Sequence, residues 1–320
     1  MLAQPKILVT CPVTTIEPTL DIRSALKQGM AELRGALVSS HTLAAEVLLM
    51  HVLRRDRAWM YSHHEEILDP VAAQKYFALI ARRAAGEPTQ YITGHQEFWG
   101  LDFDVTSAVL IPRPETEHVM EVALARLGDR GLKIHMDTGA PRQTLRVADV
   151  GTGSGCLAVA LAYELPHAQV IATDISAAAL EVAKRNAARH NVSERITFIE
   201  TDLLSALPNI PDDARYFDLI VSNPPYIAES EAATLQREVR DHEPHSALFG
   251  GSTGVEIYDR LLAQAQMKLR DRGILVLELG HDSAGYVQSL FDADPVSWTK
   301  VSLTMDLAGI PRVLAAERVR

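Results

Sequence analysis

The sequence contains very little cysteine and no long hydrophobic run. Among its 320 residues there are 2 cysteines, Cys11 and Cys156, which lie far apart and form no Cys-x-x-Cys pair. Neither a disulfide framework nor a cysteine-based metal site is available, which is the pattern of proteins from a reducing compartment. No stretch approaches the roughly 18 consecutive apolar residues that a membrane-spanning helix needs, so we expect no membrane association.

An excess of positive charge is also missing. The chain has 31 lysines and arginines against 41 aspartates and glutamates, which gives a formal net charge of −10. Proteins that hold duplex DNA or RNA usually present a basic face, so we expect no direct binding of nucleic acid. Residues 1–18 contain one lysine and no apolar core of a signal peptide, which favours a cytoplasmic protein.

Clusters with the spacing of metal ligands are absent as well. His63 and His64 precede two glutamates, but the run does not follow the His-Glu-x-x-His pattern. Pro244 separates His242 from His245 and argues against a shared helical face. We therefore expect no metal site.

The overall composition is typical of a soluble globular protein with one large or two ordinary domains, because 47% of its residues are hydrophobic and 22% are charged. Residues 1–18 contain three prolines and no periodicity, which predicts a flexible tail. Residues 19–93 carry apolar side chains at helical spacing, with Ser40 and the Asp69-Pro70 pair placed to begin helices. We interpret this stretch as a small helical bundle that docks the substrate or supports the fold, because it holds no catalytic cluster.

The pattern changes after the helical bundle. Residues 94–112 contain short β-rich runs and predict a β-hairpin linker, and residues 113–320 form the second domain. Within that domain, Arg113 and Glu117 flank a predicted helix start, where they either line a site or pair with each other. Residues 128–144 are polar and contain glycine and proline, so we expect an exposed insertion without catalytic residues.

A glycine-rich turn connects the first predicted strand of this domain, at 145–150, to a helix. The turn reads Gly151-Thr152-Gly153-Ser154-Gly155, and its glycines allow positive φ angles and close approach of a ligand to the backbone. The next strand ends in Asp174, where a carboxylate accepts hydrogen bonds from ribose hydroxyls. The strand after that leads into Asp202 and Leu203, which we expect to contact an adenine.

These features predict a cofactor that contains adenosine. The glycine turn has the spacing Gly-x-Gly-x-Gly rather than the Gly-x-Gly-x-x-Gly of pyrophosphate-binding folds, and no Gly-Lys-Ser/Thr follows it. Binding of ATP phosphates is therefore disfavoured. S-adenosyl-L-methionine suits the pattern better, because it combines adenosine and an electrophilic methyl group without a phosphate; its product is S-adenosyl-L-homocysteine.

The predicted strand at 217–222 runs into Asn223-Pro224-Pro225-Tyr226. The two prolines fix φ near −65° and lack N–H donors, so the loop is stiff and offers acceptors. The side-chain oxygen of Asn223 and the carbonyl of Pro224 could each accept one hydrogen of a planar NH2 group, with the Tyr226 ring against its face. A proline-terminated strand with an ordinary turn is the alternative.

The downstream sequence completes an α/β fold. Residues 233–240 predict a helical lid, 254–270 an amphipathic helix and 273–280 a buried strand. Two last strands, at 299–305 and 311–316, predict a C-terminal antiparallel hairpin. The expected fold class is therefore a helical bundle, a hairpin linker and a Rossmann-like domain with a mostly parallel seven-stranded sheet.

Taken together, the motifs resemble the PrmC/HemK family of protein-(glutamine-N5) methyltransferases that act on peptide chain release factors. The resemblance covers about residues 20–318. It is carried by Gly86-Glu87-Pro88, Tyr91 to Gly94, Glu97 to Gly100, Leu110 to Glu117, Asp149 to Gly155, Val221 to Ile227, Leu277 to Gly280 and Asp306 to Val313.

The resemblance implies a class I S-adenosylmethionine-dependent methyltransferase whose partner is the Gly-Gly-Gln loop of class I release factors. It implies that Gly151 to Gly155, Asp174, Leu203 and Asn223 contact the cofactor and that Asn223 to Tyr226 hold the glutamine amide. Some members of the family have tryptophan where this chain has Leu203, so adenine would meet an aliphatic side chain here.

Three alternatives share parts of these motifs. A glutamine methyltransferase of a large-subunit ribosomal protein, as in the related PrmB enzymes, has both the glycine turn and the Asn-Pro-Pro-Tyr loop. An adenine-N6 methyltransferase of nucleic acids has the loop, although the negative net charge argues against it. A cofactor-binding interaction protein without activity is disfavoured, because both motifs are intact.

Overall fold

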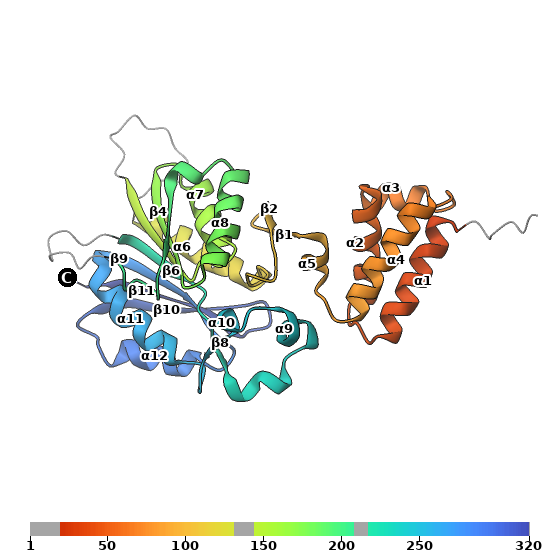
Figure 1. Cartoon of the computed structure of the whole chain (residues 1–320). Coiled ribbons are helices and arrows are strands. Elements are labelled where there is room, and N and C mark those ends of the chain that lie inside the picture. The colour runs from red at the N-terminus through yellow and green to blue at the C-terminus, as the bar shows by residue number, and fades with distance from the viewer. Residues whose placement is uncertain (1–19, 131–143, 208–216, 320) are drawn as a thin grey trace, which may run out of the picture. The chain divides into compact units, whose positions relative to one another are not determined.

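The computed structural model describes residues 20–130, 144–207 and 217–319 (Figure 1). The predicted tail at 1–18 and most of the predicted insertion at 128–144 lie outside the described residues. The chain divides into two compact units, Met1–Thr89 and Gln90–Arg320.

The first unit is a helical bundle. Its helices are α1 (Ile22–Gly35), α2 (His41–Leu53), α3 (Arg57–Ser62) and α4 (Pro70–Ala84). Asp21, Asp56 and Asp69 begin α1, α3 and α4 by accepting hydrogen bonds from first-turn amides, and Pro70 occupies the first helical position of α4. Ser40 stands at the start of α2 as predicted, but its side chain makes no capping hydrogen bond.

Helices α1, α2 and α4 pack against one another. The interior between them is filled by large side chains that are fully buried, namely Leu33, Leu48, Leu49, Tyr76 and Ile80. Each such side chain stabilises the fold by about 1.5–3 kcal/mol through loss of contact with water. The helical periodicity read from the sequence therefore reflects a real core.

The boundary between the units falls after the first residue of α5 (Thr89–Thr93), and the second unit continues with the hairpin of β1 (His95–Phe98) and β2 (Leu101–Asp104). The two turn residues, Trp99 and Gly100, both have positive φ angles, of 54° and 71°. This is the geometry of a type I′ turn, which matches the twist of two antiparallel strands. The Trp99 backbone amide donates to Glu117 at 2.8 Å and its indole donates to Glu164 at 2.9 Å, so the turn is held against α6 (Glu117–Asp129) and α7 (Cys156–Glu164).

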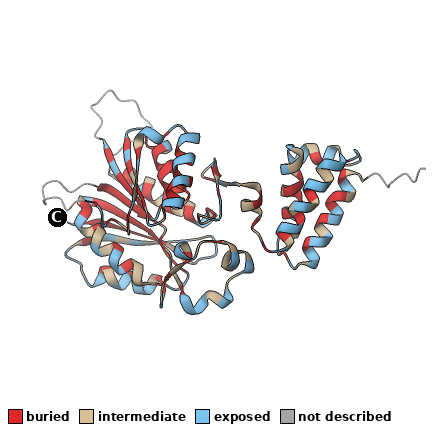
Figure 2. Cartoon of the chain, viewed as in Figure 1, coloured by how far each residue is buried: buried red, intermediate tan, exposed pale blue. Residues whose placement is uncertain are grey.

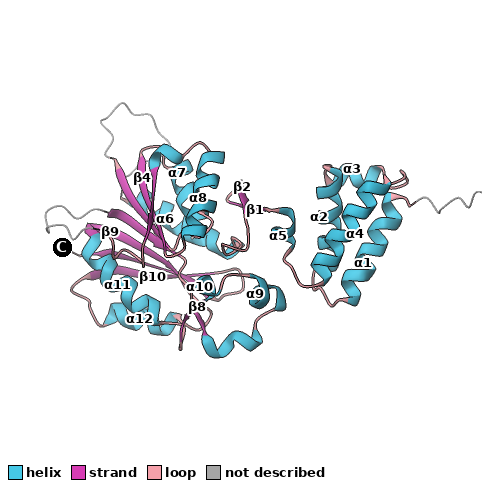
Figure 3. Cartoon of the chain, viewed as in Figure 1, coloured by secondary structure: helices cyan, strands magenta, loops and turns pink. Residues whose placement is uncertain are grey.

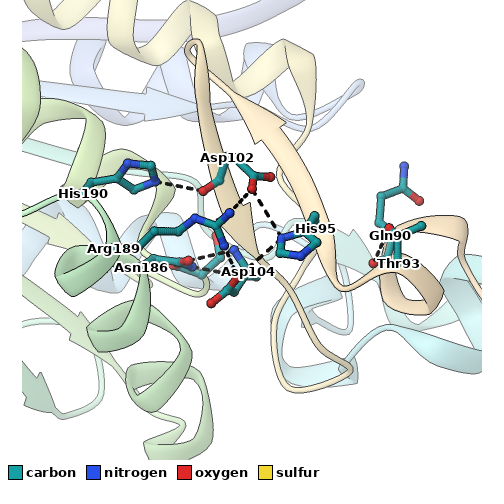
Figure 4. A network of polar contacts seen from close by, with 9 residues as sticks. Gln90, Thr93, His95, Asp102, Asp104, Asn186, Arg189 and His190 are labelled. Atoms are coloured by element: carbon teal, nitrogen blue, oxygen red, sulfur yellow. Dashed lines mark hydrogen bonds and ion pairs between the residues drawn. The ribbon is translucent and has the colours of Figure 1, made fainter. Parts of the chain in front are cut away.

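The other side of the hairpin is bound to α8 (Ala177–Arg189) through a polar network (Figure 4). Arg189 forms ion pairs with Asp102 and Asp104, and the ring of His190 donates to the Asp102 carbonyl at 2.8 Å. Asn186 is fully buried and exchanges two hydrogen bonds with the Asp104 backbone, of 2.7 and 3.0 Å. The hairpin is therefore an integral part of the second unit.

The centre of the second unit is a sheet, whose strands are drawn in magenta in Figure 3. It has seven strands in the order β10-β11-β9-β6-β3-β4-β5. Its strands are β3 (Leu145–Val150), β4 (Ala168–Asp174), β5 (Ile196–Glu200), β6 (Phe217–Ser222), β9 (Leu269–Glu278), β10 (Trp298–Met305) and β11 (Pro311–Arg318). All pairs from β9 to β5 are parallel, and β11 is antiparallel to both of its neighbours. The predicted Rossmann-like sheet with a C-terminal antiparallel hairpin is confirmed.

Helices cover both faces of the sheet, which is why every residue of its central strand β6 is buried. Alternate residues of β3 show the two faces, since Val147 packs with α6, α7 and α8 while Ala148 packs with the opposite layer. That layer consists of α11 (Glu256–Lys268) and α12 (Ala284–Asp292). Figure 2 shows the buried strands between helices whose outer faces are exposed.

Short elements complete the unit. They are η1 (Pro114–Thr116), η2 (Ser193–Arg195), β7 (Ile227–Ala228), η4 (Glu229–Thr234), α9 (Arg237–His242), α10 (His245–Leu248) and β8 (Phe249–Gly251). The helix predicted over 233–240 is thus divided between a 3₁₀ turn and α9. Within the described ranges, no helix has the length and apolarity needed to cross a membrane.

Candidate active site

A cavity of about 260 Å³ lies at the carboxyl ends of β3, β4, β5 and β6. The chain order of the strands changes direction between β3 and β6, and open α/β sheets bind ligands at such a point. The predicted residues that line the cavity are Gly151, Thr152, Gly153, Ser154, Asp174, Asp202, Leu203, Asn223 and Pro225. Gly155, Pro224 and Tyr226 do not line it. Every described lining residue belongs to the second unit.

The glycine turn between β3 and α7 has an open backbone surface. Gly151 and Gly153 have φ angles of 74° and 54°, and a Cβ added at either would meet no atom within 4 Å. Gly155 has a structural task instead, because its Cβ would lie 2.9 Å from the Cβ of Ala183 on α8. The first two glycines therefore leave room for a ligand, and the third allows two helices to approach closely.

Asp149 of β3 holds the glycine turn in place through hydrogen bonds. Its Oδ2 accepts hydrogen bonds from the Thr152 hydroxyl at 2.6 Å and the Ala158 amide at 3.0 Å. Its Oδ1 is buried and has no hydrogen-bond partner among the described residues. Burial raises the pKa of Asp149 to about 7, against the effect of both hydrogen bonds. A cationic group in the cavity would satisfy the free oxygen and favour the ionised form.

Asp174 ends β4 and also lines the cavity. Its Oδ2 accepts from the Gly153 amide and its Oδ1 from the Ser176 amide, both at 2.9 Å. Each carboxylate oxygen can accept a second hydrogen bond, so the group can receive two neighbouring hydroxyls. Burial raises the pKa of Asp174 above its ordinary value, although the backbone hydrogen bonds oppose this change.

The turn after β5 carries the predicted adenine contacts. Leu203 has a φ of 53°, an uncommon backbone conformation for a residue with a branched side chain. The Leu204 amide holds the turn by donating to Gln264 on α11 at 2.8 Å. Asp202 forms an ion pair with Arg260 of α11, which also lines the cavity. Arg260 gave no sequence signal, because it reaches the site from a helix that begins more than fifty residues later.

The Asn-Pro-Pro-Tyr loop is fixed by close contacts with glycines. A Cβ on Gly250 would lie 2.5 Å from the Pro225 carbonyl, and one on Gly254 would lie 2.5 Å from the Tyr226 carbonyl. The Tyr226 ring lies against Gly280, where a Cβ would be 2.9 Å from the ring. Pro224 is buried, so only Asn223 and Pro225 of the loop line the cavity.

The Asn223 side chain has a defined orientation. Its Nδ2 donates to the Thr116 hydroxyl at 3.1 Å, which leaves Oδ1 as an acceptor. Thr116 in turn donates to Oε2 of Glu278 at 2.7 Å, and the Tyr226 hydroxyl lies 3.4 Å from the other Glu278 oxygen. Thr116 and Glu278 belong to the sequence motifs Leu110 to Glu117 and Leu277 to Gly280. Only the structure shows that the two side chains are linked to Asn223 by hydrogen bonds.

Arg113 and Glu117 do not pair with each other. Arg113 lines the cavity and forms an ion pair with Glu243, whose carboxylate also accepts from the Ile111 amide at 3.3 Å. Burial raises the pKa of Glu243, and the charge of Arg113 opposes this. Glu117 instead accepts a hydrogen bond from the Trp99 backbone amide in the hairpin turn. Of the two predicted alternatives, a site-lining role applies to Arg113 alone.

Two sequence families match this chain, the PrmC N-terminal domain over residues 24–94 and the Methyltransferase small domain over residues 125–242. The release factor glutamine methyltransferase of Koribacter versatilis is 43% identical over 300 residues, which covers 93% of this chain and 99% of that protein. The protein of the same name from Nitratidesulfovibrio vulgaris is 39% identical over 307 residues and covers 96% and 98%. That from Chlorobaculum tepidum is 43% identical and covers 93% and 98%.

Among solved structures, the catalytic domain of hMettl16 in complex with MAT2A 3'UTR hairpin 6 has a TM-score of 0.52 at 20% identity, and the match covers 74% of this chain and 81% of that one. At this identity the likeness shows a shared fold alone. The relatives with 39–43% identity along nearly the whole chain decide the family. The chain belongs to the release factor glutamine methyltransferase family, and its second unit has the fold of a class I S-adenosylmethionine-dependent methyltransferase.

Proposed function

We propose that this protein transfers a methyl group from S-adenosylmethionine to the side-chain amide nitrogen, N5, of a glutamine in the Gly-Gly-Gln loop of class I peptide chain release factors. The proposal is supported by the names of its relatives and by one observation above all. Asn223 turns its NH2 toward Thr116 and so keeps its oxygen as an acceptor beside the cavity. A release factor substrate and the few cysteines of the chain fit a protein of the cytoplasm.

The residues of the cavity fit S-adenosylmethionine in three respects. The open backbone at Gly151 and Gly153 admits a ligand, and Asp174 has two oxygens ready for the hydroxyls of a ribose. The unpartnered Oδ1 of Asp149 suits an ammonium group such as that of the methionine part. When bound, the cofactor supplies an electrophilic methyl group on its sulfonium sulfur.

The chain's own residues must then position the glutamine amide. An amide nitrogen is a poor nucleophile because its lone pair is delocalised into the carbonyl. We propose that Oδ1 of Asn223 and the backbone carbonyl of Pro224, which stands between the lining residues Asn223 and Pro225, each accept one N–H of the glutamine, with Tyr226 supporting the loop. Positioning of this kind lowers a barrier by about 7–11 kcal/mol in favourable cases. The described lining contains no histidine or lysine, so no imidazole or amine is available there to take the proton that the nitrogen loses.

The first unit is proposed to dock the release factor. It contributes no described residue to the cavity lining, and its sequence matches the PrmC N-terminal domain. The chemistry and the recognition of the protein substrate are thus assigned to different units.

The test is methyl transfer from labelled S-adenosylmethionine to a purified class I release factor. Its Gly-Gly-Gln to Gly-Gly-Ala variant, large-subunit ribosomal proteins and duplex DNA serve as parallel substrates. We expect label on the wild-type factor alone. Label on a ribosomal protein instead would support the glutamine methyltransferase alternative, and label on DNA would support an adenine methyltransferase. Absence of label in every sample, with cofactor bound, would contradict the proposal.

A further inference from the structure

We infer that Thr116 and Glu278 are positioning residues, and that together they hold the Asn223 amide in the one orientation that can accept a hydrogen bond from the substrate. This inference rests on the proposed function, because it concerns how Asn223 receives the glutamine amide. It assigns a role to two buried polar side chains that the proposed contacts leave unexplained.

The three residues come together from separate parts of the chain. Thr116 ends η1 and is 107 residues from Asn223, which follows β6. Glu278 ends β9 and is 162 residues from Thr116. Thr116 and Glu278 are only 2% and 1% exposed, so water does not compete for their hydrogen bonds. Buried polar groups are usually satisfied by partners within the protein, and here the partners are each other.

The polarity of the network runs in one direction. An ionised carboxylate can only accept hydrogen bonds, so the Thr116 hydroxyl donates its single hydrogen to Glu278. Thr116 then has only lone pairs to offer Asn223 and receives an N–H from its Nδ2. The Asn223 amide cannot turn over, because its oxygen would then face the lone pairs of Thr116. Its Oδ1 is therefore kept as the acceptor of the site.

Other groups around Glu278 keep its side chain in place. Tyr226 contacts Oε1, and the Tyr258 hydroxyl donates to the Glu278 backbone carbonyl at 3.0 Å. The charged neighbours are Arg312 of β11, which favours the ionised form, and Glu115 of η1, which opposes it. Burial has the largest effect and raises the pKa of Glu278 to about 7.

Protonation of Glu278 would reverse the network. A carboxylic acid can donate to Thr116, whose own proton is then free to turn toward Asn223. The Asn223 side chain would then favour its other orientation, in which Nδ2 points toward the substrate and no acceptor is presented. Because the ionised form prevails above the folded pKa, the rate of methyl transfer is expected to rise as the pH passes upward through about 7.

The main experiment compares T116V with T116S in the full-length protein. Valine has the shape of threonine without the hydroxyl, whereas serine keeps it. With a purified release factor at saturation, we expect T116V to lower kcat by about 10- to 100-fold, which is the effect of a small misplacement of a reacting group. We expect T116S to restore kcat to within about threefold of wild type.

Two further measurements separate positioning from other roles. Thr173 is a second buried threonine, and its hydroxyl has no hydrogen-bond partner in the described part of the chain, so T173V is the matched control and should retain full kcat. Binding of S-adenosylhomocysteine by calorimetry should be nearly equal in wild type and T116V. An equal kcat in T116V and wild type would overturn the inference. So would a loss of S-adenosylhomocysteine affinity as large as the loss of kcat, since Thr116 would then act as a cofactor contact.

The pH profile of kcat tests Glu278. At saturating S-adenosylmethionine, where the bound ammonium group keeps Asp149 ionised, we expect a rise near pH 7 in the wild type and a flat profile in E278Q, whose side chain does not ionise in this range. A rise that persists in E278Q would contradict the role of Glu278. Failure of the proposed function would look different from failure of this inference. If the proposed function were wrong, the wild-type protein itself would methylate no release factor.

Discussion

The Asn223 amide donates through Nδ2 to Thr116 and keeps its oxygen for the substrate. Replacement by alanine removes this acceptor and leaves the rest of the loop in place, since the loop is fixed by its contacts with glycines. We expect N223A to lower kcat by about 10²- to 10³-fold, the usual effect of losing one oriented polar group in an active site. Affinity for S-adenosylhomocysteine, measured by calorimetry, should fall much less.

A comparison with the Gly-Gly-Ala release factor completes this prediction. With that substrate the wild-type protein and N223A should both be inactive. Near-normal turnover of N223A on saturating wild-type factor would contradict the proposed pair of hydrogen bonds.

Gly155 is the glycine of the turn that contacts protein. Its φ of 81° is strained for any other residue, and an added Cβ would lie 2.9 Å from the Cβ of Ala183. We expect G155A to lower the free energy of unfolding by about 1–3 kcal/mol, from backbone strain and crowding together. Urea denaturation measures the change.

Gly128 is the matched control for this substitution. It lies in α6, has no positive φ, and an added Cβ there would meet nothing within 4 Å. G128A should leave the stability unchanged or raise it by up to about 1 kcal/mol, because alanine favours a helix more than glycine does. Equal effects of the two substitutions would contradict the backbone strain and the crowding against Ala183 that we assign to position 155.

Helix α8 connects the hairpin to the glycine turn. Asn186 binds both backbone polar groups of Asp104 on β2 (Figure 4). Its Nδ2 also donates to the Ser154 carbonyl in the turn at 2.8 Å. One buried side chain thus ties the linker hairpin to the loop proposed to hold the cofactor.

Substitution of Asn186 by alanine should be costly. It would leave three backbone groups without their partner, one of them in a buried contact and two in part-buried contacts. We expect N186A to lower the free energy of unfolding by about 2–4 kcal/mol, since each unsatisfied buried group costs about 1–3 kcal/mol and some relaxation occurs. Thermal and urea denaturation would measure this loss.

Glu181, on the same helix, provides the comparison. Its ion pair with Lys184 is exposed, so E181A should change the stability by less than about 0.5 kcal/mol. If N186A were as mild as E181A, the network in Figure 4 would not contribute to the fold in the way described.

The division into two units leads to a prediction about substrate recognition. Removal of residues 1–89 deletes the first unit and leaves every described residue of the cavity lining. We expect the remaining unit to bind S-adenosylhomocysteine with affinity within about threefold of the full chain. Its kcat/KM on a release factor should fall by about 10- to 100-fold, which corresponds to the loss of about 1.4–2.8 kcal/mol of docking contacts.

A short peptide that contains Gly-Gly-Gln distinguishes docking from catalysis in this experiment. Such a peptide is too small to need the first unit, so the full chain and the shortened chain should methylate it at similar rates. An equally large loss on the peptide would indicate that the first unit supports the catalytic unit rather than the substrate.

The parts of the site that follow one another along the chain could be predicted from sequence. The strand before Gly151, the acid at Asp174 and the loop at Asn223 each depend on local patterns of apolar residues, glycine and proline. Parallel strands place their carboxyl ends at one edge of a sheet, so these separate motifs were expected to meet. Their roles toward cofactor and substrate remain proposals.

Contacts between distant segments were decided only by the tertiary structure. Local patterns indicated neither that Arg113 would pair with Glu243 nor that Arg260 would reach Asp202. The path from Asn223 through Thr116 to Glu278 likewise depends on the order of β6 and β9 in the sheet and on where η1 packs. The sequence by itself determined which chemical groups the site contains, because those groups follow strands that their own residues form. Only the packed sheet decided how these groups face one another, because hydrogen-bond direction depends on the register of segments that are not neighbours in the chain.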